Sequence, residues 1–252
     1  MMRKSLEILV AAVVLFVSTS PVMAVLTLAD GAIHNIDYYL NDDVEVDYRA
    51  PGLKTELNII AGANIYGYVV GCEDSIINIR GGHMDKASAR DNSRVTVSGG
   101  VLHDFEAHDN SQVTISGGSI RWGFHANESS QITISDGAIS SDFRASDNSQ
   151  VIVSGGFFRG ELLLYDTALL TIEGSDFAVD GTDVGYIELT SINGFGYRYE
   201  PSRLLTGTLL NGDVLDSYFR IGNSAKIVLV PEPTTLLLLG LGGLALRRRR
   251  TK

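Results

Sequence analysis

A short pattern recurs through the middle of the chain at a nearly constant interval. Each copy has an acidic residue, small polar residues, a stretch of alternating apolar side chains and, in most copies, a closing glycine pair. The copies begin at Asp91, Asp109, Glu128, Asp147 and Asp166, at intervals of 18, 19, 19 and 19 residues. Related segments lie upstream at 75–82 and around 57–59. Such a period is typical of an array in which each unit is completed by its neighbours.

Each unit shows the pattern of a half-buried strand. In Val95-Thr96-Val97-Ser98, apolar and polar residues alternate with a period of two. Glycine pairs follow most of these strands and supply the sharp turn, and the Asp-Asn-Ser segment that closes a unit suits a turn with asparagine in the left-handed region. We expect the following residues to point inward: Val95, Val97, Val113, Ile115, Ile132, Ile134, Val151, Val153, Leu102, Ile120, Ile139, Phe158, Phe105, Ala107, Phe124, Ala126, Phe143, Ala145, Leu162 and Leu164.

The fold class that follows is all-β. One unit has two or three short strands and cannot enclose a core, whereas units stacked in register at about 4.8 Å can. The sequence therefore predicts a parallel β-helix, or solenoid, of about 19 residues per coil. An antiparallel sandwich is the alternative, but it does not explain why the same residue types recur at the same point of every unit.

The repeat also suggests where the domain begins and ends. We expect an N-terminal cap over 25–54, β-helix repeats over 55–175 and capping strands over 176–229, because a solenoid needs atypical ends to cover its exposed core. Two further segments complete the chain, at 1–24 and 230–252.

The first 24 residues have the layout of a secretory signal peptide. Two cations lie within the first four residues, an apolar stretch covers 8–17, and Val22 and Ala24 occupy the positions that signal peptidase recognises. We expect cleavage after Ala24. An uncleaved anchor is the alternative.

The last 23 residues combine a proline pair, a short apolar run and a basic block. Pro231, Glu232 and Pro233 precede an apolar segment over 234–246, and the cluster comprises Arg247, Arg248, Arg249 and Arg250. The apolar segment has 13 residues, whereas a bilayer core requires about 20. Arginines beside it would remain on the cytoplasmic side. Physical reasoning alone leaves two interpretations open, a stop-transfer signal and a plain C-terminal membrane anchor.

This C-terminal arrangement resembles the PEP-CTERM sorting signal of exported bacterial proteins. The resemblance covers only these residues, together with the expected signal peptide. It implies a short hydrophobic helix that is held transiently in the inner membrane, recognised by an exosortase and cut near the Pro-Glu-Pro. It further implies delivery to the cell envelope, outer surface or exopolysaccharide matrix of a Gram-negative bacterium.

Charge and cysteine content restrict the partners of the exported body. The chain carries a formal net charge of −10, and the two end segments are basic, so the body between them is more acidic still. An acidic surface repels nucleic acid and anionic lipid, and favours cations or neutral, hydroxyl-rich polymers. Cys72 is the only cysteine, which excludes an intramolecular disulfide and a metal site built on several thiolates.

Three outward rows are candidate functional sites. The acids Asp91, Asp109, Glu128, Asp147 and Asp166 either cap turns or bind calcium. A threonine row (Thr96, Thr114, Thr133 and Thr171) with a neighbouring serine row (Ser98, Ser116, Ser135 and Ser154) is similar to ice-binding and glycan-binding grids, but threonine is also a good β-former. Glu106, His125 and Arg144 occupy equivalent positions, where pairing between coils is favoured over catalysis.

The functional expectation is a non-enzymatic, structural, adhesive or glycan-binding protein. No cofactor and no catalytic residue is expected. Many β-helices are polysaccharide lyases or hydrolases, so a carbohydrate-active enzyme is the alternative. However, the coils between 76 and 172 contain no long insertion that could form the walls of a cleft.

Overall fold

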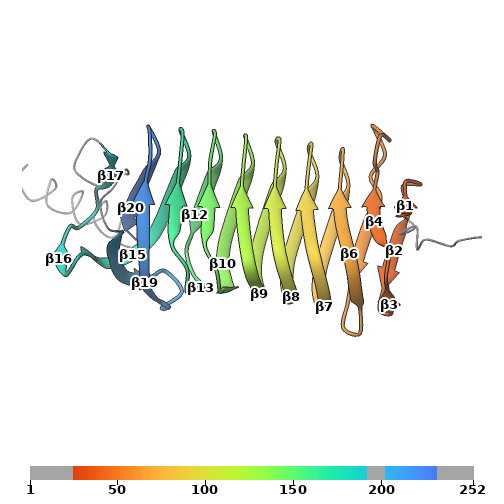
Figure 1. The fold of residues 1–252 in the computed structure, drawn as a ribbon, viewed down its shortest axis with the longest axis horizontal. Coiled ribbons are helices and arrows are strands. Elements are labelled where there is room, and N and C mark those ends of the chain that lie inside the picture. Colours follow the sequence, from red (N-terminus) through yellow and green to blue (C-terminus); the bar gives the residue numbers. More distant parts are fainter. Residues whose placement is uncertain (1–24, 192–201, 232–252) are drawn as a thin grey trace, which may run out of the picture.

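A computed structural model describes residues 25–191 and 202–231 of the chain. Within these ranges the protein is an all-β, parallel β-solenoid of about 8 turns with roughly 19-residue spacing, as predicted. Figure 1 shows the coils side by side along the long axis, from the red and orange N-terminal coils to the blue β20. The signal peptide, Ala24 and the expected C-terminal hydrophobic helix lie outside the described residues.

Each coil contributes strands to three faces, and every face is a parallel ladder along the solenoid axis. Face 1 contains β2 (Ile33–Ile36), β5 (Glu56–Ile59), the first parts of β7 (Ile76–Ala89), β8 (Arg94–Ala107), β9 (Gln112–Ala126) and β10 (Gln131–Ile139), then β12 (Gln150–Val153), β15 (Leu169–Val179) and β20 (Lys226–Pro231). Face 2 contains β3 (Tyr39–Leu40), β6 (Asn64–Gly71), the middle of β7 to β9, the end of β10 and β13 (Phe157–Phe158). Face 3 contains β1 (Val25–Leu28), β4 (Asp43–Val46), the ends of β6 to β9, β11 (Phe143–Ala145), β14 (Leu162–Leu164) and β19 (Val214–Ile221).

The two end segments of the solenoid differ from each other. At the N-terminal end, β1 and β2 already pair in parallel with the next coil, so residues 25–54 follow the coil path. At the C-terminal end the chain leaves the coil through β16 (Thr182–Asp183), β17 (Glu188–Thr190) and β18 (Arg203–Leu209), which form antiparallel pairs. It then rejoins the stack, where β19 and β20 pair in parallel with β14 and β15.

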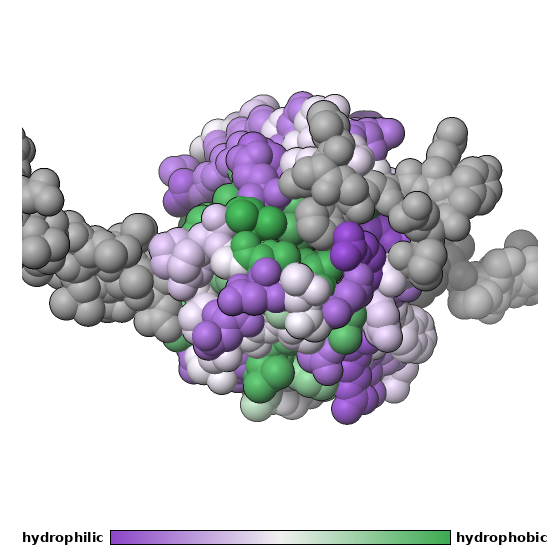
Figure 2. Space-filling view, turned by 90° about the vertical axis from the view of Figure 1, so that its left-hand side faces the viewer, coloured by the Kyte–Doolittle hydropathy of each residue, from purple (hydrophilic) through white to green (hydrophobic). Residues whose placement is uncertain are grey.

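Apolar ladders fill the interior. All the residues predicted to point inward are buried, each with at most 5% of its surface exposed. Phe105, Phe124, Phe143 and Phe158 form a column in which successive rings meet edge to face, with centroids 5.3, 5.0 and 6.5 Å apart. Edge-to-face pairs of this kind add to the free energy gained by burial alone. The view onto the C-terminal end in Figure 2 shows hydrophobic residues gathered at the centre and hydrophilic ones around them.

The turns explain two features of the repeat. The second glycine of each pair has a positive φ, as at Gly100 (87°), and a Cβ there would lie 2.7 Å from the carbonyl oxygen of Gly81 in the preceding coil. The prediction that asparagine adopts the left-handed conformation is wrong. The acidic residue before it does so, with φ of 55° to 59° at Asp91, Asp109, Glu128, Asp147 and Asp166. Aspartate tolerates this region because its short side chain can form local hydrogen bonds.

Cys72 is a buried free thiol directly after β6. Burial raises its pKa to about 11, and the nearby Asp91 carboxylate acts in the same direction. The thiol therefore stays protonated and unreactive at neutral pH. Within the described residues there is no helix long and apolar enough to cross a membrane.

The phenylalanine column gives the first testable prediction. Phe124 is fully buried between Phe105 and Phe143, so Phe124→Ala should leave a cavity that neighbouring coils cannot close. We expect it to lower the free energy of unfolding by about 3–5 kcal/mol, measured by urea denaturation. Thr114→Ala, on the outer face of the same strand, is the control and should change it by less than about 1 kcal/mol. Equal losses in the two variants would contradict a packed phenylalanine column.

Candidate functional site

The acidic row is a chain of hydrogen bonds between coils. The carboxylate of Asp91 accepts the backbone N–H of Glu73 at 3.0 Å, and that of Asp109 accepts the N–H of Asp91 at 3.0 Å. Glu128, Asp147 and Asp166 repeat the contact one coil later each time. A residue in the left-handed conformation turns its backbone N–H away from the strand ladder. The carboxylate of the equivalent residue in the next coil accepts a hydrogen bond from this N–H. This geometry gives the row a structural function, and calcium binding by it stays a prediction.

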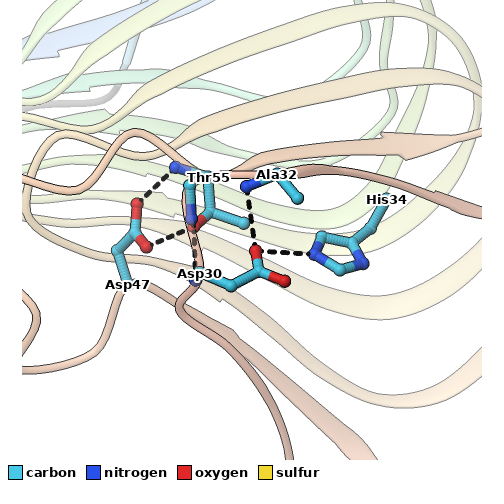
Figure 3. Close-up of polar contacts among 6 residues, drawn as sticks. Asp30, Ala32, His34, Asp47 and Thr55 are labelled. Carbon is cyan, nitrogen blue, oxygen red and sulfur yellow. Dashed lines mark hydrogen bonds and ion pairs between the residues drawn. The ribbon is translucent and has the colours of Figure 1, made fainter.

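A variant of this turn closes the first coil. Asp47 is fully buried and has a φ of 56°. Its two carboxylate oxygens accept the backbone N–H of Thr55 at 2.8 Å and the Thr55 hydroxyl at 2.6 Å (Figure 3). The Thr55 hydroxyl oxygen in turn accepts the N–H of Gly31 at 2.9 Å, and Asp30 pairs with His34 at 2.9 Å. The N-terminal coil is thus tied to the second through Thr55, whose contacts with Asp47 are buried.

The threonine row lies on face 1, where the sequence places it, whereas register shifts at the end of that face place Ser116 opposite Asp136 and not opposite Ser135. Thr96, Thr114 and Thr133 are aligned in register, and Ile152 interrupts the row before Thr171. Three of the four serine hydroxyls form hydrogen bonds to the backbone. Those of Ser98, Ser135 and Ser154 donate to carbonyl oxygens of the preceding coil at 3.4–3.5 Å.

Glu106, His125 and Arg144 are in register across β8, β9 and β11, as expected. The Glu106 carboxylate, however, forms its ion pairs with other residues. Glu106 pairs with Lys86 at 2.7 Å and with His108 at 3.4 Å. Partial burial alone would raise the pKa of Glu106, but these two partners outweigh it, so the pKa lies below its usual value. Burial and the adjacent Arg144 both lower the pKa of His125, which favours neutral imidazole.

A surface groove of about 420 Å³ lies across β4 and β6 to β9, and it is the candidate functional site. Its lining combines aromatic rings with charged groups: Asp43, Tyr66, Gly67, Tyr68, Asp85, Lys86, Asp104 and Trp122. Tyr68 is 51% exposed and Trp122 is 64% exposed. Exposed aromatic side chains that gather in one patch, unlike those scattered singly, are typical of a recognition surface.

The backbone at the groove is held closely to the preceding coil. The N–H of Tyr68 donates to the Asp43 carboxylate at 2.8 Å. A Cβ at Gly67 would lie 2.5 Å from the carbonyl oxygen of Asp42, so glycine is required there. The ammonium group of Lys86 lies 5.4 Å from the centre of the Tyr68 ring, a cation–π contact that orients both side chains.

Beside the groove, five rings from successive coils form a continuous surface row, which we call the aromatic row: Tyr39, Tyr66, His83, His103 and Trp122. Successive ring centroids are 5.7, 6.3, 4.6 and 3.9 Å apart. The last pair is stacked, with an interplanar angle of 13°.

Sequence reasoning missed this row and the groove. The signal is weak, because the five residues are of three types and their spacing is disturbed by the long turn between β4 and β5, an irregularity within β6 and a bulge in β9. A lone histidine in a strand is in addition a weak sequence signal, because it is compatible with a solvated side chain as well as with a site.

The sorting tail begins without a linker at the last coil. Leu229 is buried in the core, and Pro231 lies opposite Gly174 in the pairing of β20 with β15. Glu232, Pro233 and the four arginines of the tail lie outside the described residues.

Comparison with known protein families identifies this tail. The PEP-CTERM protein-sorting motif matches residues 229–250. No curated protein and no solved structure matches the chain. The motif makes the protein an exosortase substrate that is exported to the cell envelope.

The acidic row gives the second testable prediction. Asp109→Ala removes the acceptor for the Asp91 N–H and forces alanine into a left-handed conformation, so it should lower the free energy of unfolding by about 1–3 kcal/mol. Asp109→Asn keeps both an acceptor oxygen and a residue that tolerates this region, and should change it by less than about 1 kcal/mol. Urea denaturation measures both. A loss in the asparagine variant as large as in the alanine variant would show that the charge, and not the hydrogen bond, matters.

Proposed function

Because the chain carries a PEP-CTERM protein-sorting motif on a β-solenoid, we propose that it is a non-enzymatic surface or matrix protein that binds an extracellular polysaccharide. The binding site is the groove on β6 to β9 together with the aromatic row. The observation that carries the proposal is the exposure of Tyr68 and Trp122 beside Asp85 and Asp104 in one groove.

The chemistry of the groove suits a neutral, hydroxyl-rich polymer. A sugar ring has apolar C–H faces, which pack on flat aromatic side chains, and hydroxyl groups around its edge, which donate hydrogen bonds to carboxylates. The aromatic row runs along the solenoid axis, one ring per coil. A linear polymer aligned with that axis would therefore meet a ring at successive coils.

The location of the groove is compatible with attachment of the protein to the membrane through its C-terminal end. The sorting motif begins in β20, whereas the groove lies on β6 to β9, several coils away along the axis (Figure 1). A protein held by its C-terminal tail during sorting would thus direct the groove away from the membrane. A stack of hydrogen-bonded coils supplies the stiffness that such a display requires.

Binding without cleavage is favoured because two of the three acids that line the groove already have partners in the protein. The Asp43 carboxylate accepts the backbone N–H of Tyr68, and Asp85 Oδ1 lies 3.2 Å from Nδ1 of His103. A lyase or hydrolase on the same groove is the alternative.

Sorting is tested with two epitope tags, one after Ala24 and one after Lys252. We expect the C-terminal tag to be lost only in cells that contain the exosortase, and the N-terminal tag to reach the envelope or matrix. Alanine at Pro231, Glu232 and Pro233 should preserve the C-terminal tag, and alanine at Arg203 is a control outside the motif. Retention of both tags in the inner membrane in every strain would establish a permanent anchor instead.

Polysaccharide binding is tested on the full-length chain with exopolysaccharide from the host, by affinity electrophoresis in the presence of chelator. Tyr68→Ala and Trp122→Ala should each weaken binding by about 1 kcal/mol, or roughly fivefold in Kd. Tyr218→Ala is the matched control, since Tyr218 is 52% exposed on β19, outside the groove.

Equal retention of the groove variants and the control would contradict the proposed site. Release of reducing ends or of unsaturated sugars by the native protein, but not by the groove variants, would establish the enzyme.

A further inference from the structure

Two histidines and an aspartate meet on face 2 at one edge of the groove. In the part of the chain that the structure describes, the ligand atoms of His83, Asp85 and His103 all lie within 4.8 Å of one another. We propose that these three side chains bind a divalent transition-metal ion of the zinc, nickel and copper class.

The repeat places the three ligands together. His83 and Asp85 are two residues apart on β7, so their side chains leave the same side of the strand. The pairings of Met84 with Leu102 and of Lys86 with Asp104 set His103 of β8 beside Asp85. Met84 and Leu102 are fully buried, so the backbone that carries the three ligands is fixed by the core.

An unpartnered nitrogen atom of His103 is a second, independent observation in favour of a metal site. The Nδ1 atom of this side chain is buried and has no hydrogen-bond partner. Asp85 Oδ1 lies 3.2 Å from it, close enough for an ion pair but without hydrogen-bond geometry. The two atoms thus lie side by side, as two ligands of one ion do. A buried nitrogen without a hydrogen bond costs free energy that coordination would recover.

The distances fit a tetrahedral ion after small side-chain rotations. With bonds of about 2.0–2.1 Å, a tetrahedral zinc ion holds its ligand atoms roughly 3.3 Å apart. The contact between His103 and Asp85 already has this length, and His83 must approach by roughly 1.5 Å or less. Two imidazoles and one carboxylate favour transition metals over calcium or magnesium, which take all-oxygen ligand sets. Three protein ligands leave a fourth position for water or a ligand.

Trp122 provides a built-in reporter for this site. It is the only tryptophan of the chain, and its ring stacks on His103 with a centroid distance of 3.9 Å. A nickel or copper ion bound to His103 would lie close to the indole and quench its fluorescence. The metal site does not depend on polysaccharide binding, and the assays below contain no polymer.

The primary test is calorimetric titration of the untagged, chelator-stripped, full-length chain with Zn²⁺. We expect one ion per chain. His83→Asn should weaken binding at least about tenfold. His108→Asn is the matched control, since His108 is also a partly exposed imidazole beside a carboxylate, that of Glu106, and it should leave the affinity unchanged. Native affinity in His83→Asn, or binding without fixed stoichiometry, would overturn the proposal.

The second test follows Trp122 fluorescence during titration with Ni²⁺. Saturable quenching by one equivalent is expected in the native protein and in His108→Asn. It should be lost in His83→Asn, which leaves the stack of His103 and Trp122 intact. If circular dichroism shows that His83→Asn does not fold, Asp85→Asn replaces it, because the Asp85 side chain is 43% exposed. Equal quenching in the native protein and in the ligand variants would show adventitious surface binding and overturn the site.

Discussion

Hydrogen bonding between parallel strands of successive coils is the constraint on which the remaining structure depends. A parallel ladder stays in register only if each coil has nearly the same path, so turns must fall at the same point every 18 or 19 residues. Identical paths place like residues above one another. The phenylalanine column, the acidic row and the threonine row are therefore consequences of one geometric requirement.

The acidic turns show how this requirement shapes sequence. At the left-handed corner the backbone N–H leaves the ladder, and the carboxylate one coil later accepts it. A row of like charges is thus retained because each member supplies a hydrogen bond between coils. The acidic surface that results is one reason why we propose a neutral polymer, and not an anionic one, as the ligand.

The groove on β6 to β9 departs from the repeat. There the outward residues are large and varied, as at Tyr68, Asp85 and Trp122, whereas small threonine side chains repeat in register along face 1. A regular scaffold that carries an irregular patch separates stability from recognition, so the patch can differ without disturbing the core. The polysaccharide and the metal ion proposed for this region both follow from that patch.

The sequence alone determined the solenoid, its period, its inward residues and the sorting signal of the exported chain. Alternating Val95 and Val97, the glycine pairs and the tail at 229–250 are local patterns whose physical meaning does not depend on distant residues. Only the tertiary structure decided which outward side chains meet. His83, Asp85, His103 and Trp122 are brought together by a register that includes a bulge in β9, and the corner acid, not the asparagine, takes the left-handed conformation. Both outcomes depend on contacts between coils, which a single repeat does not contain.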